Sequence, residues 1–506
     1  MRSGVVVTWG PSIRRGVAAT LAALTVAGCG APALTLPEDE GASVTTLSPV
    51  EPDGAVPTGT LRVAYPDMPL RWAPAADGDL AAADLQAVWG LPLFRYDAAG
   101  QLRAGLVEDF SVASDGDGWH VLLDLRDGLW SDGTPVSAED VVASLAAAQG
   151  RDAARFAALT AVGVMDDGGV RLSFSAPYAR WADLLYEAGP VLPATALTGG
   201  TDAYAGGVPV SGGWYRVAEV APGRLIRFVA HPDGPLGAPG LAEIELHVTP
   251  RYETALGLLA RGDVDLVLGY TALNAAGRAT ALEGVQAAVP LGGTWAALQF
   301  RSGGGLGGAD DAPARRGIAG AIDLSEFVEG LLGPTGAAAT SPWPGHQAPA
   351  GRVTGDAPAG RSFVLLVPDQ NEVLGFTARA IQRDLQTREV TADLVSEPSP
   401  RFVAAMTSER DAAIHLRRDP PVPALTPWAA DVDPGLVRQG EAAGRTGPGG
   451  GAAVDAVLAS ARIVPLYRVG VLHAWTETVS GLRPSAWPGA GFWNVGEWRR
   501  GADEPT

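Results

Sequence analysis

The side chains that most often carry catalysis are few and scattered in this chain of 506 residues. It contains six histidines without the close spacing of a zinc motif, and its one cysteine, Cys29, leaves no intrachain disulfide. No G-x-S-x-G segment marks a nucleophilic serine, and no pair of carboxylates has a spacing typical of glycoside hydrolysis. We therefore expect no enzyme, no resident metal and no cofactor.

The basic residues narrow the possible functions further, because all 37 of them are arginines. Without lysine the chain cannot be a Schiff-base or pyridoxal-phosphate enzyme, a P-loop ATPase or a standard protein kinase. The formal net charge of −19 argues against a nucleic-acid-binding protein, which needs a basic face. A bias toward Arg, Ala, Gly and Pro is also what a GC-rich genome produces, and the composition resembles that of actinobacterial proteins.

The first thirty residues have the three zones of an export signal. Arg14 and Arg15 precede an apolar run at 16–27, which is too short to span a bilayer, and small residues then lead to Cys29. This ending resembles the bacterial lipobox, so residues 1–29 are predicted to be a lipoprotein signal peptide. Cys29 would be acylated and would anchor the protein to the outer face of the cell membrane. An ordinary signal peptide that contains a cysteine by chance is the alternative.

Residues 30–58 are rich in proline and acidic residues and are predicted to form a flexible tether. Beyond them, short β-type runs alternate with helical patterns, which indicates a mixed α/β fold with βαβ crossings. The expected strands include 59–66, 119–126, 241–249, 263–269, 294–301, 361–368 and 462–468, and the expected helices include 80–90, 137–149, 251–261 and 370–388.

Two glycine-rich segments interrupt this alternation. Residues 303–308 satisfy G-x-G-x-x-G, but they are mostly glycine and no clear acidic residue closes a following βαβ unit. We therefore interpret them as a flexible loop between lobes rather than as a dinucleotide site. Residues 444–453 are predicted to form a second flexible loop.

The segment 105–145 resembles the signature of the family 5 extracellular solute-binding proteins of ABC importers. It runs through LLDLRDGLWSDGTPVSAEDVVASL, with a tight turn at Asp132-Gly133, a stiffening Pro135 and Ser137 as the N-cap of a helix. Further segments resemble the same family, and they lie at 209–216, 258–265, 314–323 and 463–467.

This resemblance implies an α/β, periplasmic-binding-protein-like fold (type II, cluster C), a two-lobed clamshell with an extra subdomain. The chain would cross between the lobes near 300 and again near 470. The implied division is lobe I at 59–95, 205–300 and 470–506, an accessory subdomain of lobe I at 96–204, and lobe II at 301–469.

The resemblance also suggests ligand-binding residues. Trp428 and Asp431 resemble the segment with which peptide-binding members hold an α-ammonium group, and Asp419 could take the place of Asp431. Arg417 and Arg418 could pair with a ligand carboxylate, or they could be solvated loop residues. Tyr467, Trp295 and Trp214 lie near the expected lobe crossings, where each could be a ligand wall or a core residue.

The implied function is a lipid-anchored, extracytoplasmic solute-binding protein of an ABC importer. Its ligand would be a peptide or a similar small solute, its partners would be the permease subunits and the membrane, and it would be a monomer that binds no nucleic acid. Two departures from the family favour an alternative. Gln299-Phe300-Arg301 replaces a pattern that usually contains asparagine, and the chain looks short between 431 and 463. The alternative is a homologue that has lost transport and acts as an accessory lipoprotein of the cell envelope.

Overall fold

The structure of the chain is a computed structural model. It describes residues 56–69, 71–72, 79–115, 118–198, 204, 206–301, 305–306, 311–339, 358–369, 371–398, 401–402, 405, 411–420, 425, 429, 432–443, 450–487 and 489–501. Cys29, Trp428, Asp431 and most of the segment 303–308 lie outside these residues, so the predictions made for them stay predictions.

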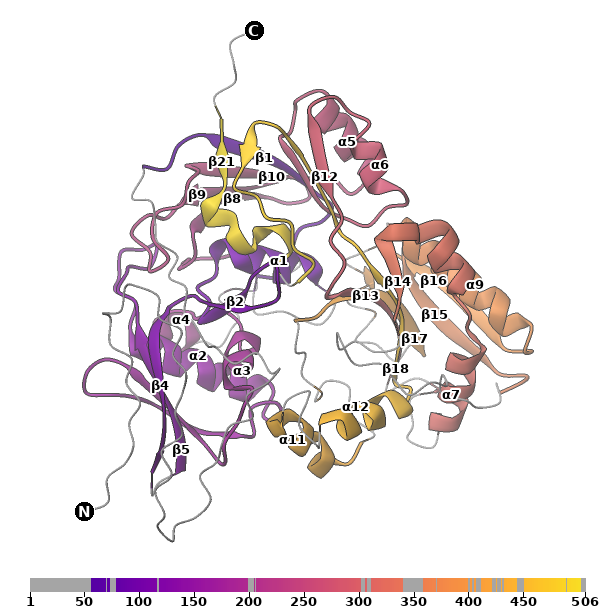
Figure 1. The fold of residues 1–506 in the computed structure, drawn as a ribbon, viewed down its shortest axis with the longest axis horizontal. Helices are drawn as coiled ribbons and strands as arrows, with labels where there is room; N and C mark the ends of the chain where they lie inside the picture. Colours follow the sequence, from indigo (N-terminus) through magenta and orange to yellow (C-terminus); the bar gives the residue numbers. More distant parts are fainter. Residues whose placement is uncertain are drawn as a thin grey trace, which may run out of the picture.

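The first lobe is built on a seven-stranded sheet with the order β12-β19-β11-β1-β10-β9-β8 (Figure 1). Its strands are β1 (Thr60–Tyr65), β8 (Tyr215–Ala221), β9 (Leu225–Ala230), β10 (Glu243–Val248), β11 (Leu266–Tyr270), β12 (Val285–Ala288) and β19 (Leu472–Thr476). β1 pairs in parallel with both β10 and β11. The helices α5 (Tyr252–Ala260) and α6 (Ala275–Ala279) contribute residues to one apolar core of this lobe, and α1 (Leu80–Trp89) contributes to another.

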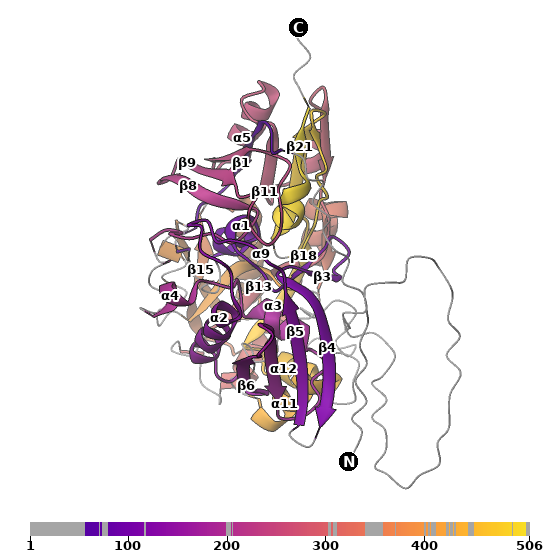
Figure 2. The same ribbon diagram turned by 90° about the vertical axis from the view of Figure 1, so that its left-hand side faces the viewer.

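A subdomain extends from the first lobe and is seen clearly in Figure 2. Its four-stranded sheet has the order β4-β5-β7-β6, and its helices are α2 to α4. The bounds are β4 (Val107–Asp115), β5 (Gly118–Leu125), α2 (Ala138–Arg151), β6 (Leu159–Val164), β7 (Val170–Phe174), α3 (Trp181–Glu187) and α4 (Ala194–Leu197). Its core is continuous with that of the first lobe, because one buried cluster contains Val63 of β1, Leu85 of α1 and Val121 of β5. A small ribbon of β2 (Phe94–Tyr96) and β3 (Leu102–Ala104) lies at this junction.

The second lobe is built on a six-stranded sheet with the order β14-β18-β13-β17-β15-β16. The strands are β13 (Thr294–Phe300), β14 (Gly336–Ala338), β15 (Ser362–Pro368), β16 (Thr391–Glu397), β17 (Ala412–Arg418) and β18 (Ile463–Val469). α7 (Ala312–Ala321) and α9 (Glu372–Gln386) pack against one core, and α11 (Pro434–Ala443) and α12 (Gly450–Ala459) pack against another. Short helical segments at Ser325–Phe327, Val328–Leu332 and Gly333–Thr335 lead into β14.

The chain passes between the two sheets twice, and the two crossing segments touch each other. It enters the second lobe between β12 and β13 and returns between β18 and β19. At the return, a Cβ on Gly470 would lie 2.3 Å from Val289 Cγ1 and 3.0 Å from the Val289 carbonyl oxygen. Only glycine therefore fits where the crossing strands pass. After β19, the chain ends in β20 (Val479–Ser480), the 3-10 segment η6 (Ala490–Glu497) and β21 (Arg499–Arg500).

The strands and helices expected from the sequence are present at the positions that build both sheets. The helix expected at 137–149 is α2, and Ser137 caps it as predicted, in a capping box with Asp140. One prediction is wrong in part, because α12 begins at Gly450 although the sequence indicated a loop through 453. Burial of Val454 and Val457 against Trp295 offsets the poor helix propensity of the glycines.

Two expectations about the second lobe change with this architecture. The strand Thr294–Phe300 pairs with β17 and β18, so it belongs with the second lobe rather than at the end of the first. We therefore propose a boundary before residue 294. The segment between 431 and 463, which looked too short for a long helix, holds α11 and α12, each of ten residues.

Candidate functional site

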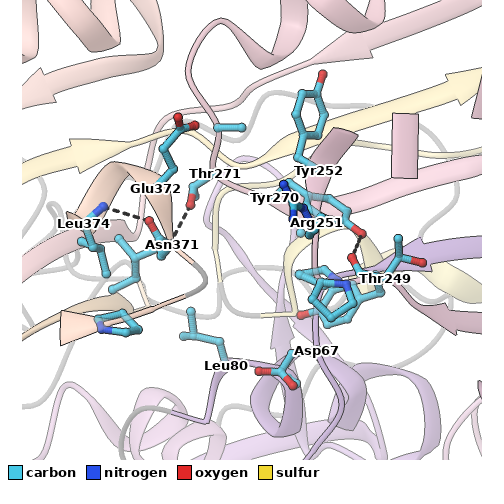
Figure 3. A pocket seen from close by; sticks show the side chains of 18 of the residues that line it. Asp67, Leu80, Thr249, Arg251, Tyr252, Tyr270, Thr271, Asn371, Glu372 and Leu374 are labelled. Carbon is cyan, nitrogen blue, oxygen red and sulfur yellow. Dashed lines mark hydrogen bonds between the residues drawn. The ribbon is translucent and has the colours of Figure 1, made fainter. Parts of the chain in front are cut away.

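A cavity of about 1300 Å³ lies between the two lobes (Figure 3). Its first-lobe wall includes Tyr65, Thr249 and Tyr270, and its second-lobe wall includes Asn371 and His415. The first four lie at or just beyond the carboxyl end of a strand, and His415 lies in the middle of β17. Open α/β sheets bind ligands in the crevice outside the carboxyl ends of their strands. The cavity occupies that place for both sheets at once.

Parallel pairing is the reason why these ends meet. β1, β10 and β11 run in the same direction in the first lobe, and β15, β16 and β17 do so in the second. Each parallel set is joined by a βαβ crossover, through α5 in the first lobe and α9 in the second. Both sets therefore end toward the cavity, and the loops that follow them line it.

The first-lobe wall is held rigid by hydrogen bonds among its own residues. The Thr249 amide donates to the Tyr65 carbonyl at 2.8 Å, and the Tyr270 hydroxyl donates to the Thr249 carbonyl. The Tyr252 hydroxyl donates to the Ala275 carbonyl at 2.8 Å. Burial raises the pKa of both Tyr65 and Tyr270, so both phenols stay protonated and can act as donors.

His415 is the buried polar group of the second-lobe wall. Its side chain is 2% exposed, and neither ring nitrogen has a hydrogen-bond partner. Burial, together with the nearby Arg417 guanidinium, lowers the pKa of His415 to about 3, so the imidazole is neutral at physiological pH. A neutral imidazole has one donor and one acceptor nitrogen to offer to a molecule in the cavity.

A buried ion cluster joins the lobes beside the cavity. Arg418 of β17 pairs with Asp84 of α1, and the Tyr65 hydroxyl donates to the same Asp84 oxygen at 2.6 Å. Arg418 Nε also donates to Thr294 Oγ1 at 3.1 Å within the second lobe. Although burial opposes the charge on Arg418, the Asp84 carboxylate raises its pKa overall, so the cluster is ionic.

Two further contacts connect the lobes. Asn371, the N-cap of α9, accepts a hydrogen bond from the Leu374 amide at 2.9 Å and donates one to Thr271 Oγ1 at 3.1 Å (Figure 3). Arg180, just before α3 of the subdomain, pairs with Glu441 of α11, and both side chains are less than one-tenth exposed. The lobes are thus joined at the cavity and at the subdomain.

Of the eight ligand-binding residues suggested by the sequence, Arg418 lines this cavity, and its charge is paired with Asp84. Asp419 is the next residue in the chain, but its carboxylate is hydrogen-bonded to side chains of the second lobe. It accepts from Trp295 Nε1 at 2.6 Å and from Arg417 Nη2 at 3.0 Å. These interactions use the Asp419 carboxylate and the Arg417 guanidinium to join β13 to the end of β17.

The remaining aromatic candidates lie in packed cores. Trp295 is fully buried against α12, and Trp214 is buried in the first-lobe core beneath the Arg95 guanidinium. The Tyr467 hydroxyl lies 2.6 Å from Thr377 Oγ1, and its ring packs against Phe327. None of the three lines the cavity, so we leave them out of the site that we propose.

Sequence reasoning missed most of the cavity residues, although a usable signal was present. Asp67, Arg251, Thr271 and Glu372 directly follow expected strands or begin the next helix. Reading the residues beyond each parallel strand as one set would have found them. His415 gave no such signal, because one polar residue in an apolar run is as typical of a satisfied core position.

Among the described residues, no group of three or more His, Cys, Asp or Glu side chains is placed to hold a metal ion. No described helix has the length and apolar character needed to cross a membrane.

Comparisons with known proteins relate this architecture to a family of binding proteins. Residues 101–361 match the model of bacterial extracellular solute-binding proteins, family 5 Middle. No curated protein sequence matches the chain. The solved structures that it resembles include the oligopeptide-binding protein AppA from Bacillus subtilis in complex with a nonapeptide. The TM-score is 0.76 at 15% identity, covering 88% of this chain and 100% of that one.

Two further solved structures share the fold. AgaA of A. tumefaciens R10, in complex with agropinic acid, has a TM-score of 0.75 at 20% identity, covering 88% of this chain and 99% of that one. NikZ from Campylobacter jejuni, in complex with Ni(L-His), has a TM-score of 0.74 at 18% identity, covering 88% and 100%. The ligands of these structures differ widely, so the likeness supports the α/β two-lobed fold and leaves the ligand to be argued from this chain.

Proposed function

Because the chain belongs to the bacterial extracellular solute-binding proteins of family 5, we propose that it is the solute-binding component of an ABC importer. The observation that carries the proposal is the cavity between the lobes, which is lined by the loops after both sets of parallel strands. Its volume of about 1300 Å³ is large enough for a short peptide or a solute of similar size. ATP hydrolysis and translocation would belong to the partner subunits.

Binding would work by differential contact with the closed lobes. A solute in the cavity touches both walls only when the lobes are together, so it favours the closed state by the contacts it gains there. The Asn371–Thr271 hydrogen bond and the Arg418–Asp84 pair form across the same gap. The closed form would then dock on the permease.

We also propose that the mature protein is anchored at Cys29 to the outer face of the cell membrane. The support is the lipobox-like sequence around this cysteine. Labelling with a fatty-acid analogue in a bacterial host should modify the wild type but not the Cys29→Ala variant. Labelling of both, or of neither, would contradict the anchor without affecting the solute-binding role.

One observation favours the alternative of a homologue that acts as an envelope accessory protein without transport. The lobes are joined by the Arg418–Asp84 pair, which involves no solute. A protein that closes on its own ion pairs could present one fixed surface to an envelope partner. This alternative predicts scattering profiles that do not change when candidate solutes are added.

The decisive experiment is mass spectrometry of the small molecules released when the purified chain is denatured. Thermal-shift and scattering measurements with peptides, opines and nickel–histidine chelates would accompany it. We expect a bound solute that raises the melting temperature and decreases the radius of gyration. An empty protein that responds to none of these solutes would overturn the importer role in favour of the accessory one.

A further inference from the structure

The tyrosines of the described cavity lining have their hydroxyl groups bonded within the chain. The Tyr65 hydroxyl donates to a carboxylate at 2.6 Å, the Tyr252 hydroxyl donates to a backbone carbonyl at 2.8 Å, and the Tyr270 hydroxyl also donates to a backbone carbonyl. On the second-lobe wall, the Asn371 side chain accepts one hydrogen bond and donates another, as the dashed lines in Figure 3 show. These side chains shape the cavity, but their hydrogen bonds are made to groups of the chain.

His415 differs from them, because its imidazole lines the cavity without a hydrogen bond. It lies in the middle of β17 and is 2% exposed, and neither ring nitrogen has a partner among the described residues. The backbone of Leu416 lies beside the ring without reaching hydrogen-bond geometry. Buried polar groups in folded proteins are almost always hydrogen-bonded, and one that is left unpaired lowers the stability of the fold. An imidazole that is unpaired within the chain and belongs to a cavity wall is placed to pair with a molecule bound there.

The surroundings of His415 decide which kind of solute group suits it. The side chains of Phe402 and Leu416 line the same wall, and the guanidinium groups of Arg417 and Arg301 are close enough to oppose a positive charge on the ring. Burial and these arginines act in the same way on a solute group beside the imidazole, so they disfavour an ammonium group there.

A carboxylate is disfavoured at the same place for a different reason. It would lose its hydration among the apolar side chains of the wall, and the Arg417 guanidinium already pairs with Asp419 at 3.0 Å. An uncharged amide or hydroxyl group avoids both costs. Such a group can donate and accept hydrogen bonds, and therefore matches either nitrogen of a neutral imidazole.

We propose that His415 is a specificity-determining residue of the cavity, and that it forms a hydrogen bond to an uncharged amide or hydroxyl group of the bound solute. Because the ring nitrogens are covered in this structure, a small shift of neighbouring side chains accompanies the bond, as is common at binding surfaces. Peptides and sugars both carry groups of this chemistry. The inference deepens the proposed function, because it rests on the cavity being a solute site and adds the class of group recognised at its second-lobe wall.

The first test compares stability with binding in one variant, His415→Leu. Leucine removes an unpaired buried polar group, so we expect the melting temperature of the chain without added solute to rise by about 1–3 °C. The same substitution should weaken solute binding. A histidine with a purely structural role would give the opposite change in melting temperature, because its replacement would remove a stabilising interaction. A fall in melting temperature for His415→Leu would therefore contradict the inference.

The second test is isothermal titration of the full chain, purified in detergent, with four probes. N-acetyl-Ala-Ala-Ala amide offers uncharged amides, maltotriose offers hydroxyl groups, spermidine is a cation and tricarballylate is an anion. We expect one of the two uncharged probes to bind about tenfold or more tightly than either charged probe. Tighter binding of the capped peptide would identify an amide site, and tighter binding of maltotriose would identify a hydroxyl site.

Variants then assign the binding to the imidazole. His415→Leu should weaken the preferred uncharged probe about tenfold, and His415→Gln, which keeps a donor and an acceptor, should recover part of the loss. His473→Leu is the matched control, because His473 is equally buried but is not part of the described cavity lining, and it should leave probe binding unchanged. Circular dichroism of each variant checks that it folds.

Failure of the inference and failure of the proposed function are distinguishable. Spermidine or tricarballylate binding as tightly as the uncharged probes would overturn the preference for an uncharged group and leave the solute-binding role intact. Equal binding of the preferred probe by wild type and His415→Leu would reject the role of His415, again without affecting the solute-binding role. If these four probes and the wider solute panel all fail to bind, the proposed function itself is wrong, and the inference fails with it.

Discussion

Two regions lie where the lobes meet: the ion cluster of Tyr65, Asp84 and Arg418, and the cavity beside it. They differ in whether their polar groups are paired with groups of the chain. In the cluster, a cation from one lobe is matched by a carboxylate and a phenol from the other. In the cavity, carboxylates stand on both walls and the imidazole of His415 has no partner. The first arrangement joins the lobes with groups of the chain alone, whereas the second is the place where we propose that a solute binds.

This difference separates closure from recognition. The cluster sets how strongly the lobes attract each other, and the cavity sets which solute adds to that attraction. Carboxylates occur in both regions, but their surroundings differ. Asp84 meets an arginine of the same chain, whereas Asp67 belongs to the lining of the cavity.

The largest effect is expected when the carboxylate of the cluster is removed, because this tests whether the ion cluster holds the lobes together. Asp84→Ala leaves the Arg418 charge without its counter-ion in a buried place, which should cost the closed state about 3–5 kcal/mol. We expect lower stability in urea and a larger radius of gyration, because an open cleft lets water solvate the arginine. Small-angle scattering and urea denaturation measure the two effects.

The control for this variant is Arg261→Ala, which breaks an exposed ion pair with Asp263 and should cost at most about 1 kcal/mol. Adding Arg418→Met to Asp84→Ala should recover much of the lost stability, since no charge is then left buried. If Asp84→Ala behaves like Arg261→Ala, the cluster does not hold the lobes.

The pH dependence of the free energy of unfolding tests how two buried histidines, His473 and His415, resist protonation. Burial lowers the pKa of His473 to about 4 and that of His415 to about 3, although Nδ1 of His473 donates a hydrogen bond to the Val471 carbonyl at 2.9 Å. Because the unfolded chain binds protons from about pH 6.5 downward and the folded chain does not, stability is full above pH 6.5 and falls toward pH 4.

For His473 the loss between pH 7 and pH 4 should be about 2–3 kcal/mol, and His473→Gln should remove that share of the slope in urea denaturation. His247→Gln, at a partly exposed position, is the control substitution. NMR signals of the imidazole carbons allow His415, which lines the cavity, to be compared with His473, which does not. A solute that binds in the cavity should move the signals of His415 and leave those of His473 in the first lobe unchanged. An unchanged slope in His473→Gln would show that this histidine does not resist protonation.

The second ion pair between the lobes should matter less than the first. Glu441→Gln removes the charge that Arg180 shares with α11, but Glu187 still lies 3.0 Å from the same guanidinium. We expect a loss of about 2 kcal/mol, in the range for a hydrogen bond to a charged group. A double-mutant cycle with Arg180→Met isolates the coupling. A loss equal to that of Asp84→Ala would mean that the subdomain, and not the cluster, holds the lobes.

The smallest effect concerns the hydrogen bond at the cavity edge. Thr271→Val removes the acceptor for Asn371 while leaving the cap of α9 in place, and it should cost about 1 kcal/mol or less. Asn371→Ala also removes the cap and should cost about 1 kcal/mol more. Urea denaturation of both variants measures the difference. Equal losses would show that the cap contributes nothing beyond the contact between the lobes.

The sequence by itself determined the α/β architecture, because the period of the apolar residues decides locally between strand and helix. Ser137 caps its helix as expected, and strands lie at the expected segments 59–66, 241–249, 263–269, 294–301, 361–368 and 462–468. The strands β12, β14, β16 and β19 were not predicted. The chain also crosses between the sheets twice, near 470 and before Thr294, whereas the family resemblance implied a first crossing near 300. These features depend on neighbours in the chain, or on motifs that the whole family shares.

The site was decided only by the tertiary structure. Asp84 and Arg418 are 334 positions apart, and nothing local marks them as partners. Arg417, Arg418 and Asp419 are consecutive, yet one faces a carboxylate of the other lobe while its neighbours pair with each other. Successive residues of a strand point to opposite faces, so the fate of each side chain depends on what packs against its own face. That packing is set by the meeting of two sheets from distant parts of the chain, which no local pattern contains.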